Sequence, residues 1–173
     1  MARKNAVGKR PWAAGGLAGL AAGVGMGLVL HFALGLMPVI ATLIGGETAL
    51  VGWIVHLFNS TLFGLLFVAV FARPFFEELL ADLDGCVSLG VVHSAALGLL
   101  TGGLLLPVAL ALDGATSLPV PTLPFPGVDV GAEFAVVIAL AHVLYGVLLG
   151  GAYATLTGVA RTTGVPADED APV

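Results

Sequence analysis

The 173-residue chain is 58% hydrophobic and only 10% charged, with a mean hydropathy of +1.07. A water-soluble domain is about half apolar and about a quarter charged, so this composition excludes a soluble domain and indicates a protein of the lipid bilayer. The net charge of −5 comes with no basic patch, which excludes nucleic acid as a partner, and the single cysteine excludes an intrachain disulfide.

Four apolar blocks follow one another along the chain, at about 12–39, 48–72, 87–112 and 133–160. Each exceeds the ~20 residues that a helix needs to cross ~30 Å of hydrocarbon. The first block is too long for the apolar region of a signal peptide, so we interpret it as a retained helix. The sequence therefore predicts an all-α membrane protein in which residues 12–160 form one domain of four transmembrane helices.

Two loops have their own patterns. After the second block, Pro74, early glutamates and Gly85 bracket a segment whose aromatic and leucine side chains share one face, which predicts a short interfacial helix. The segment 113–131 before the fourth block contains four prolines, so we expect it to be extended rather than helical.

The basic residues determine the predicted orientation. With four crossings, all six fall on one side: Arg3, Lys4, Lys9, Arg10, Arg73 and Arg161. The positive-inside rule places that side in the cytoplasm of a multi-pass cell-membrane protein. Residues 1–11 then form a basic cytoplasmic N-terminus, and residues 161–173 an acidic, disordered cytoplasmic tail.

The second and fourth blocks align without a gap, which indicates an internal repeat. Glutamate, histidine and glycine recur at equal offsets in the pairs Glu47 and Glu133, His56 and His142, and Gly64 and Gly150. The first and third blocks align more weakly, through a Leu-x-Pro-Val motif that starts at Leu36 and at Leu105. Two two-helix halves in the same orientation predict a parallel repeat, with its axis along the membrane normal.

Small residues at a spacing of four form a ridge on each predicted helix. In lipid the hydrophobic effect between helices is weak, so such ridges let helices approach closely. They predict a tight bundle or an oligomer contact through these glycines: Gly15, Gly19, Gly23, Gly27, Gly64, Gly98, Gly102, Gly146 and Gly150.

Three histidines, His31, His56 and His142, extend these ridges and should therefore face protein rather than lipid. Under the predicted topology each lies roughly 8–14 Å below the outer boundary at 1.5 Å per residue. One interpretation is a ligand site, with haem b between His56 and His142 or a single metal held by all three. Glu47 and Glu133 would then be accessory groups at the outer surface.

The other interpretation of the histidines is structural. Each imidazole would hydrogen-bond a backbone carbonyl or a polar neighbour such as Asn59 or Tyr145, and so fix the helix register. The spacing alone leaves the two interpretations open.

The His-x7-Gly pattern of 56–64 and 142–150, the Leu-Leu-Leu-Pro end of the third block and Ala141-His142-Val-Leu-Tyr145-Gly146 carry a resemblance. From about Gly15 to Gly158 the chain resembles an uncharacterised four-helix membrane family of halophilic archaea. Members are sometimes labelled histidine kinase, which this chain's short loops exclude because they leave no room for a catalytic domain. Some lie near terminal-oxidase genes, so the resemblance implies a respiratory accessory role.

Three functional hypotheses result. The preferred one is a non-enzymatic accessory or scaffold subunit that packs against a copy of itself or a larger membrane complex. The alternatives are a haem- or metal-binding electron carrier and a small transporter or channel. No nucleophile with an activating base is evident, so an enzyme is not expected.

Overall fold

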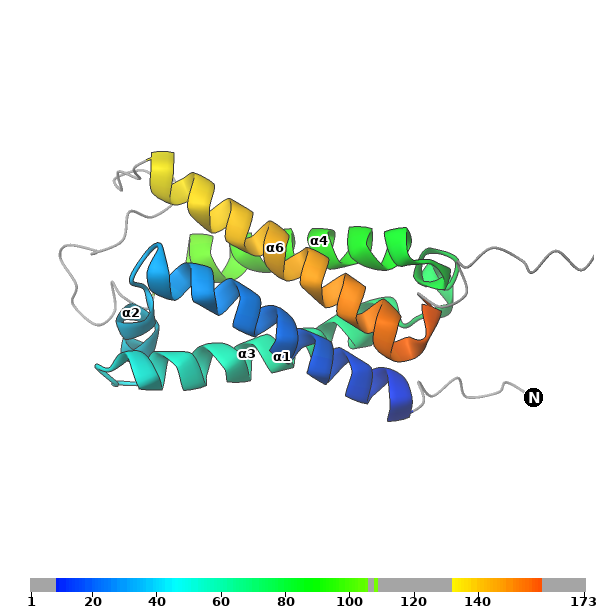
Figure 1. The fold of residues 1–173 in the computed structure, drawn as a ribbon, viewed down its shortest axis with the longest axis horizontal. Coiled ribbons are helices and arrows are strands. Elements are labelled where there is room, and N and C mark those ends of the chain that lie inside the picture. The colour runs from blue at the N-terminus through cyan, green and yellow to red at the C-terminus, as the bar shows by residue number, and fades with distance from the viewer. Residues whose placement is uncertain (1–8, 106–107, 109–131, 160–173) are drawn as a thin grey trace, which may run out of the picture.

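The computed structural model describes residues 9–105, 108 and 132–159. Within them the chain is helical, and four long helices form a bundle (Figure 1): α1 Lys9–Phe32, α3 Ala49–Phe71, α4 Leu83–Leu100 and α6 Ala132–Thr157. Each belongs to a 23-residue stretch that is long and apolar enough to cross a membrane, and for α4 this stretch continues through the π-helical turn Thr101–Leu105. The predicted fold class, an all-α protein with four membrane-spanning helices, is confirmed.

The first apolar block is not one helix, in contrast to the prediction for 12–39. The amide of Leu36 donates to Leu30 O (2.9 Å), the amide of Gly35 donates to His31 O (3.2 Å), and Gly35 has a φ of 61°. This is the usual end of a helix at a left-handed glycine. A short helix α2, Met37–Thr42, follows, with Pro38 in its first turn, where a missing N–H does no harm.

The loop between α3 and α4 also differs from its prediction in detail. It forms two separate 3₁₀ turns, η1 Pro74–Phe76 and η2 Leu79–Ala81, in place of one interfacial helix. The reason is local: Asp82 accepts a hydrogen bond from the amide of Gly85 (2.6 Å), so α4 begins at Leu83. The predicted extended segment 113–131 and the acidic tail lie outside the described residues.

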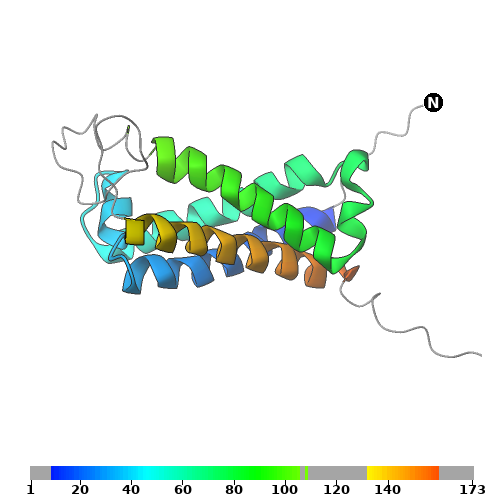
Figure 2. The same cartoon turned by 90° about the horizontal axis from the view of Figure 1, so that it is seen from above.

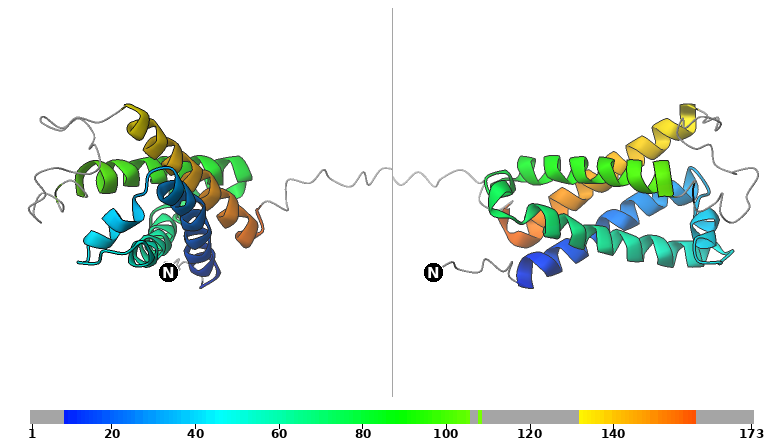
Figure 3. Two further views of the ribbon diagram at one scale, coloured as in Figure 1. Left: turned by 60° about the vertical axis from the view of Figure 1, so that its left-hand side comes forward. Right: turned by 180° about the vertical axis from the view of Figure 1, so that it is seen from behind.

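The helices pack as two hairpins, α1 with α3 and α4 with α6, and α1 also packs along α6. Figure 2 shows α6 between α1 and α4. By contrast α3 and α4 scarcely touch: they start side by side at the turns η1 and η2 and diverge toward the other end (Figure 3). We call the end with η1 and η2 the base. The described chain ends lie there too, because Arg10 donates to Leu156 O (3.5 Å).

Glycines bring α1 and α3 into backbone contact. A Cβ on Gly64 would collide with Gly15 O and lie 2.8 Å from the Cα of Gly19. A Cβ on Gly23 would lie 2.6 Å from Ser60 Oγ. These ridge positions are therefore filled by a helix of the same chain, as the small-residue pattern predicts for a tight bundle.

Glycines also bring α4 and α6 into close backbone contact. A Cβ on Gly90 would meet Gly146 O and lie 3.0 Å from the amide nitrogen of Gly150, and one on Gly98 would lie 2.6 Å from the His142 ring. In the first hairpin a Cβ on Gly27 would collide with the Trp53 ring and lie 3.1 Å from the His56 ring. Gly102 is different, because nothing lies within 4 Å of the position of its Cβ.

Gly64→Ala should lower the free energy of unfolding by about 1–3 kcal/mol, since the added methyl forces α1 and α3 apart. The matched control is Gly151→Ala on α6, where nothing lies within 4 Å of the added Cβ. It should change stability by less than about 0.5 kcal/mol. Denaturant titration in detergent micelles measures both, and equal stabilities for the two variants would contradict the packing argument.

Candidate functional site

A cavity of about 160 Å³ lies where α3 and α4 diverge, and it is partly open rather than sealed. Most of its wall is apolar. Met26 and Leu30 come from α1, and the stretch around α2 contributes Leu36, Val39, Ile40 and Leu43. Seven polar side chains interrupt this wall: His56, Asn59, Ser60, Ser94, Thr101, His142 and Tyr145. Both histidines of the predicted repeat, and the predicted neighbours Asn59 and Tyr145, therefore line one site.

Aromatic side chains close the bundle on the base side of the cavity. The ring of Phe67 packs edge-on against His93 (5.6 Å between centroids) and Tyr153 (5.3 Å), and Phe71 packs against His93 (5.8 Å). His93 also donates from Nε2 to Phe63 O (3.0 Å), which links α4 to α3. The cavity thus has a floor, built around a histidine that the ridge pattern did not single out.

His56 is tied to α1 by one ring nitrogen. Its side chain is only 8% exposed, and Nε2 lies 2.9 Å from Gly23 O. A carbonyl can only accept, so Nε2 carries the proton and Nδ1 of the neutral ring keeps a lone pair. The ring fits because Gly27 leaves no side chain in its way.

His142 uses its other ring nitrogen, Nδ1, and hydrogen-bonds to its own helix. Its Nδ1 lies 2.9 Å from Ile138 O, so Nδ1 carries the proton and Nε2 keeps the lone pair. Ser94 fixes the backbone here by donating from its hydroxyl to His142 O (2.7 Å). The sequence signal for Ser94 is its place in the small-residue ridge, four residues before Gly98.

The second nitrogen of each imidazole faces accessible space. Neither His56 Nδ1 nor His142 Nε2 has a hydrogen-bond partner among the described residues. The one side-chain atom described as both buried and unpartnered is His31 Nδ1. Both rings line the cavity, so these two nitrogens are the imidazole lone pairs that its wall can offer to an occupant.

His31 does not join the other two histidines. The Trp53 ring contacts both His31 and His56, with its centroid 6.0 Å from that of His31 and 6.2 Å from that of His56, and His31 does not line the cavity. His31 packs edge-on against Phe32 instead (4.7 Å). Among the residues that the structure describes, no cluster of three or more histidine, cysteine, aspartate or glutamate side chains is placed to hold a metal. The three histidines predicted to share one ion therefore do not meet.

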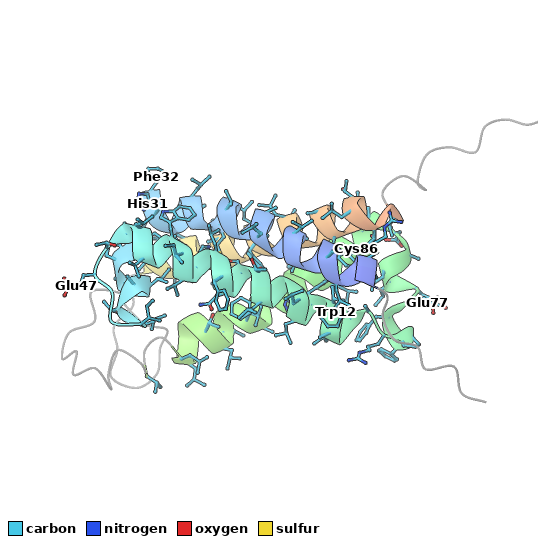
Figure 4. The ribbon with its side chains drawn as sticks, turned by 90° about the horizontal axis from the view of Figure 1, so that it is seen from below. Trp12, His31, Phe32, Glu47, Glu77 and Cys86 are labelled. Atoms are coloured by element: carbon cyan, nitrogen blue, oxygen red, sulfur yellow. The ribbon has the colours of Figure 1, made fainter. Side chains whose placement is uncertain are left out.

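The remaining predicted residues divide between the cavity and the surface. Tyr145 is buried and donates to Ser60 O (2.8 Å), which ties α6 to α3. Asn59 lines the cavity, and no described residue bonds its amide. Glu47 is exposed at the end of the bundle opposite the base, the same end as His31 (Figure 4). The side chain of Glu133 lies outside the described residues.

Known proteins offer no guide to this site. No protein-family model matches the sequence, no curated protein is significantly similar to it, and no solved structure matches its fold at that level.

The dimensions of the cavity restrict what it can hold. A cavity of about 150 Å³ takes a benzene-sized molecule, whereas sites for larger ligands measure about 300–1,000 Å³. A haem would therefore require α3 and α4 to move further apart. Water or a small molecule fits the cavity as it stands.

Tyr145→Phe should lower the free energy of unfolding by about 1 kcal/mol, because it removes the hydrogen bond between α6 and α3. Tyr153→Phe is the matched control. That tyrosine is equally buried, but no described residue accepts a hydrogen bond from its hydroxyl. The same denaturant titration compares them, and a larger loss for Tyr153→Phe would contradict the assignment.

Proposed function

We propose that this chain is a non-enzymatic membrane protein that binds a small molecule in the cavity between α3 and α4. The observation that supports the proposal is a set of polar atoms without protein partners inside an apolar, membrane-embedded wall. His56 Nδ1, His142 Nε2 and the amide of Asn59 make up this set.

Lipid tails cannot hydrogen-bond these atoms. A polar group left unpaired in an apolar medium costs about 1–3 kcal/mol by mutational measures. Three such groups at one site would lower the stability of the folded protein unless another molecule forms hydrogen bonds with them. Water relieves part of this penalty, and a ligand with suitable donors and an apolar body relieves it while also filling the apolar wall.

The accessory or scaffold role stays a prediction. The glycine ridges, which favoured it in the sequence, give it less support in the structure. Those ridges are filled by helices of the same chain, and the exposed faces carry large apolar side chains suited to lipid, such as Leu50, Ile54 and Phe58 on α3. Membership of the halophilic archaeal family, with a respiratory accessory role, is likewise part of the proposal. In that role the protein would supply the bound small molecule to a larger complex.

Electron transfer and transport also stay predictions. A haem requires a wider cavity, and a transport path requires a second conformation in which the aromatic floor opens. The small-molecule site needs neither change, which is why we prefer it.

Gly102→Leu tests the proposal, because Gly102 lines the cavity and has free space at its Cβ position. A leucine there should fill the cavity and expel the ligand without disturbing the helices. Gly151→Leu adds the same side chain at an equally open position that does not line the cavity. Native mass spectrometry of protein extracted from its own membrane should show a small bound molecule in the wild type and in Gly151→Leu, and none in Gly102→Leu. The same bound mass in all three proteins would overturn the proposal.

The proposed orientation, with the base in the cytoplasm, has a separate test. Glu47 and Glu77 are both exposed and lie at opposite ends of the bundle (Figure 4). In a Cys86→Ala background, Glu47→Cys should react with a membrane-impermeant maleimide on intact cells. Glu77→Cys should react only after the membrane is permeabilised. The reverse labelling pattern would place the termini outside.

A further inference from the structure

We infer that the cavity selects a neutral, single-ring amphiphile whose ring carries a hydroxyl, of the alkylphenol type, and that it recognises this hydroxyl as a hydrogen-bond donor. The inference rests on the proposed function and goes further by naming the chemistry of the ligand. Three features of the lining support it: the balance of donors and acceptors, the absence of charge, and the size and shape of the space.

The cavity is rich in acceptors. Three hydroxyls in its wall donate to backbone carbonyls, Ser94 to His142 O, Thr101 to Leu97 O and Tyr145 to Ser60 O. Each of these oxygens therefore has only lone pairs left. The two imidazoles are committed in the same way, because each N–H is used on a carbonyl and the free nitrogen can only accept.

Donors are scarce in the same wall. Only the amide of Asn59 and the hydroxyl of Ser60 offer protons that no described residue accepts. A ligand that brings its own donor therefore satisfies an imidazole that otherwise stays unpaired. A ligand with acceptors alone would leave both imidazoles unpaired, and the net value of one such hydrogen bond is about 0.5–1.5 kcal/mol.

The lining is also uncharged, which favours a neutral ligand over a metal ion. None of the described residues around the cavity is an aspartate, glutamate, lysine or arginine. Two imidazoles without a carboxylate or thiolate fall short of the three or four protein ligands usual for zinc. A cation at this depth would also keep its full charge in an apolar medium, at a large desolvation penalty.

The size and shape of the cavity also favour a single-ring ligand. About 160 Å³ suits one six-membered ring, since a dry cavity of about 150 Å³ binds benzene. The cavity is partly open, and its lining includes the apolar side chains of Phe63 from α3 and Leu97 from α4, so we expect an alkyl chain on the ring to leave along them. A hydroxylated ring with such a chain would meet acceptors at its head and hydrocarbon along its tail.

The test compares 4-butylphenol with 4-butylanisole, which has the same ring and chain but a methyl ether in place of the hydroxyl. Binding to the full-length protein in detergent micelles is measured by isothermal titration calorimetry, with protein-free micelles subtracted. We expect the wild type to bind the phenol about two- to tenfold more tightly than the ether, the ratio that one net hydrogen bond provides.

His142→Leu removes one of the two free imidazole nitrogens and should reduce the ratio, with His56 Nδ1 remaining as the second acceptor. The fold should survive, because among the described residues the His142 ring hydrogen-bonds only to its own helix. His31→Leu is the matched control: it removes a histidine at the same end of the bundle that does not line the cavity, and it should leave the ratio unchanged. Gly102→Leu should weaken the binding of both compounds.

The outcomes separate this inference from the proposed function. Equal binding of phenol and ether, with both lost in Gly102→Leu, overturns the donor preference but leaves the cavity as a binding site. Binding of neither compound above micelle background, or binding that Gly102→Leu does not weaken, overturns both. One zinc or copper ion bound per wild-type chain and lost in His142→Leu overturns the neutral-ligand inference in favour of a metal.

Discussion

Contact between helix backbones is the constraint on which the rest of the structure depends. Along α1 and α3 the ridge glycines leave no room for a methyl group, as at Gly19 and Gly64, and α4 and α6 meet in the same way at Gly90 and Gly150. In lipid such contacts replace the hydrophobic effect as the source of helix association. Where the ridges end, Gly27 and Gly98 leave space into which the rings of His56 and His142 fit. The positions of the imidazoles therefore follow from the packing of the helices.

The cavity arises from an asymmetry between two otherwise similar hairpins. A two-fold axis that exchanges them would make the contact of α1 with α6 equivalent to that of α3 with α4. The first is close, with Ala14, Ala18 and Ala22 fully or nearly buried on α1. The second is sparse: Phe67 and Phe71 of α3 pack against His93 of α4 near the base. Bulky rings fill the space near the base, and above them the helices diverge.

The sequence predicts the periodic features well and the three-dimensional relations poorly. Apolar length gives four membrane-spanning helices, and spacing four gives the faces that pack, because both depend only on local geometry. The same spacing does not say which neighbour a face meets. His31, His56 and His142 all extend ridges, yet only His56 and His142 line the cavity, and His31 packs against Trp53 and Phe32 instead. Gly102 continues a ridge by spacing, but it lies in the π-helical turn Thr101–Leu105, lines the cavity and has nothing within 4 Å of its Cβ position.

The two interpretations that the sequence left open for the histidines are compatible, because an imidazole has two nitrogens. In His56 and in His142 one nitrogen donates to a backbone carbonyl and fixes the ring, as the structural interpretation requires. That hydrogen bond also fixes the tautomer, so the other nitrogen must present a lone pair, as a ligand site requires. Histidines that bind metals use the same division between an anchored N–H and a free lone pair. Here two backbone carbonyls, Gly23 O and Ile138 O, determine the hydrogen-bonding character of the cavity.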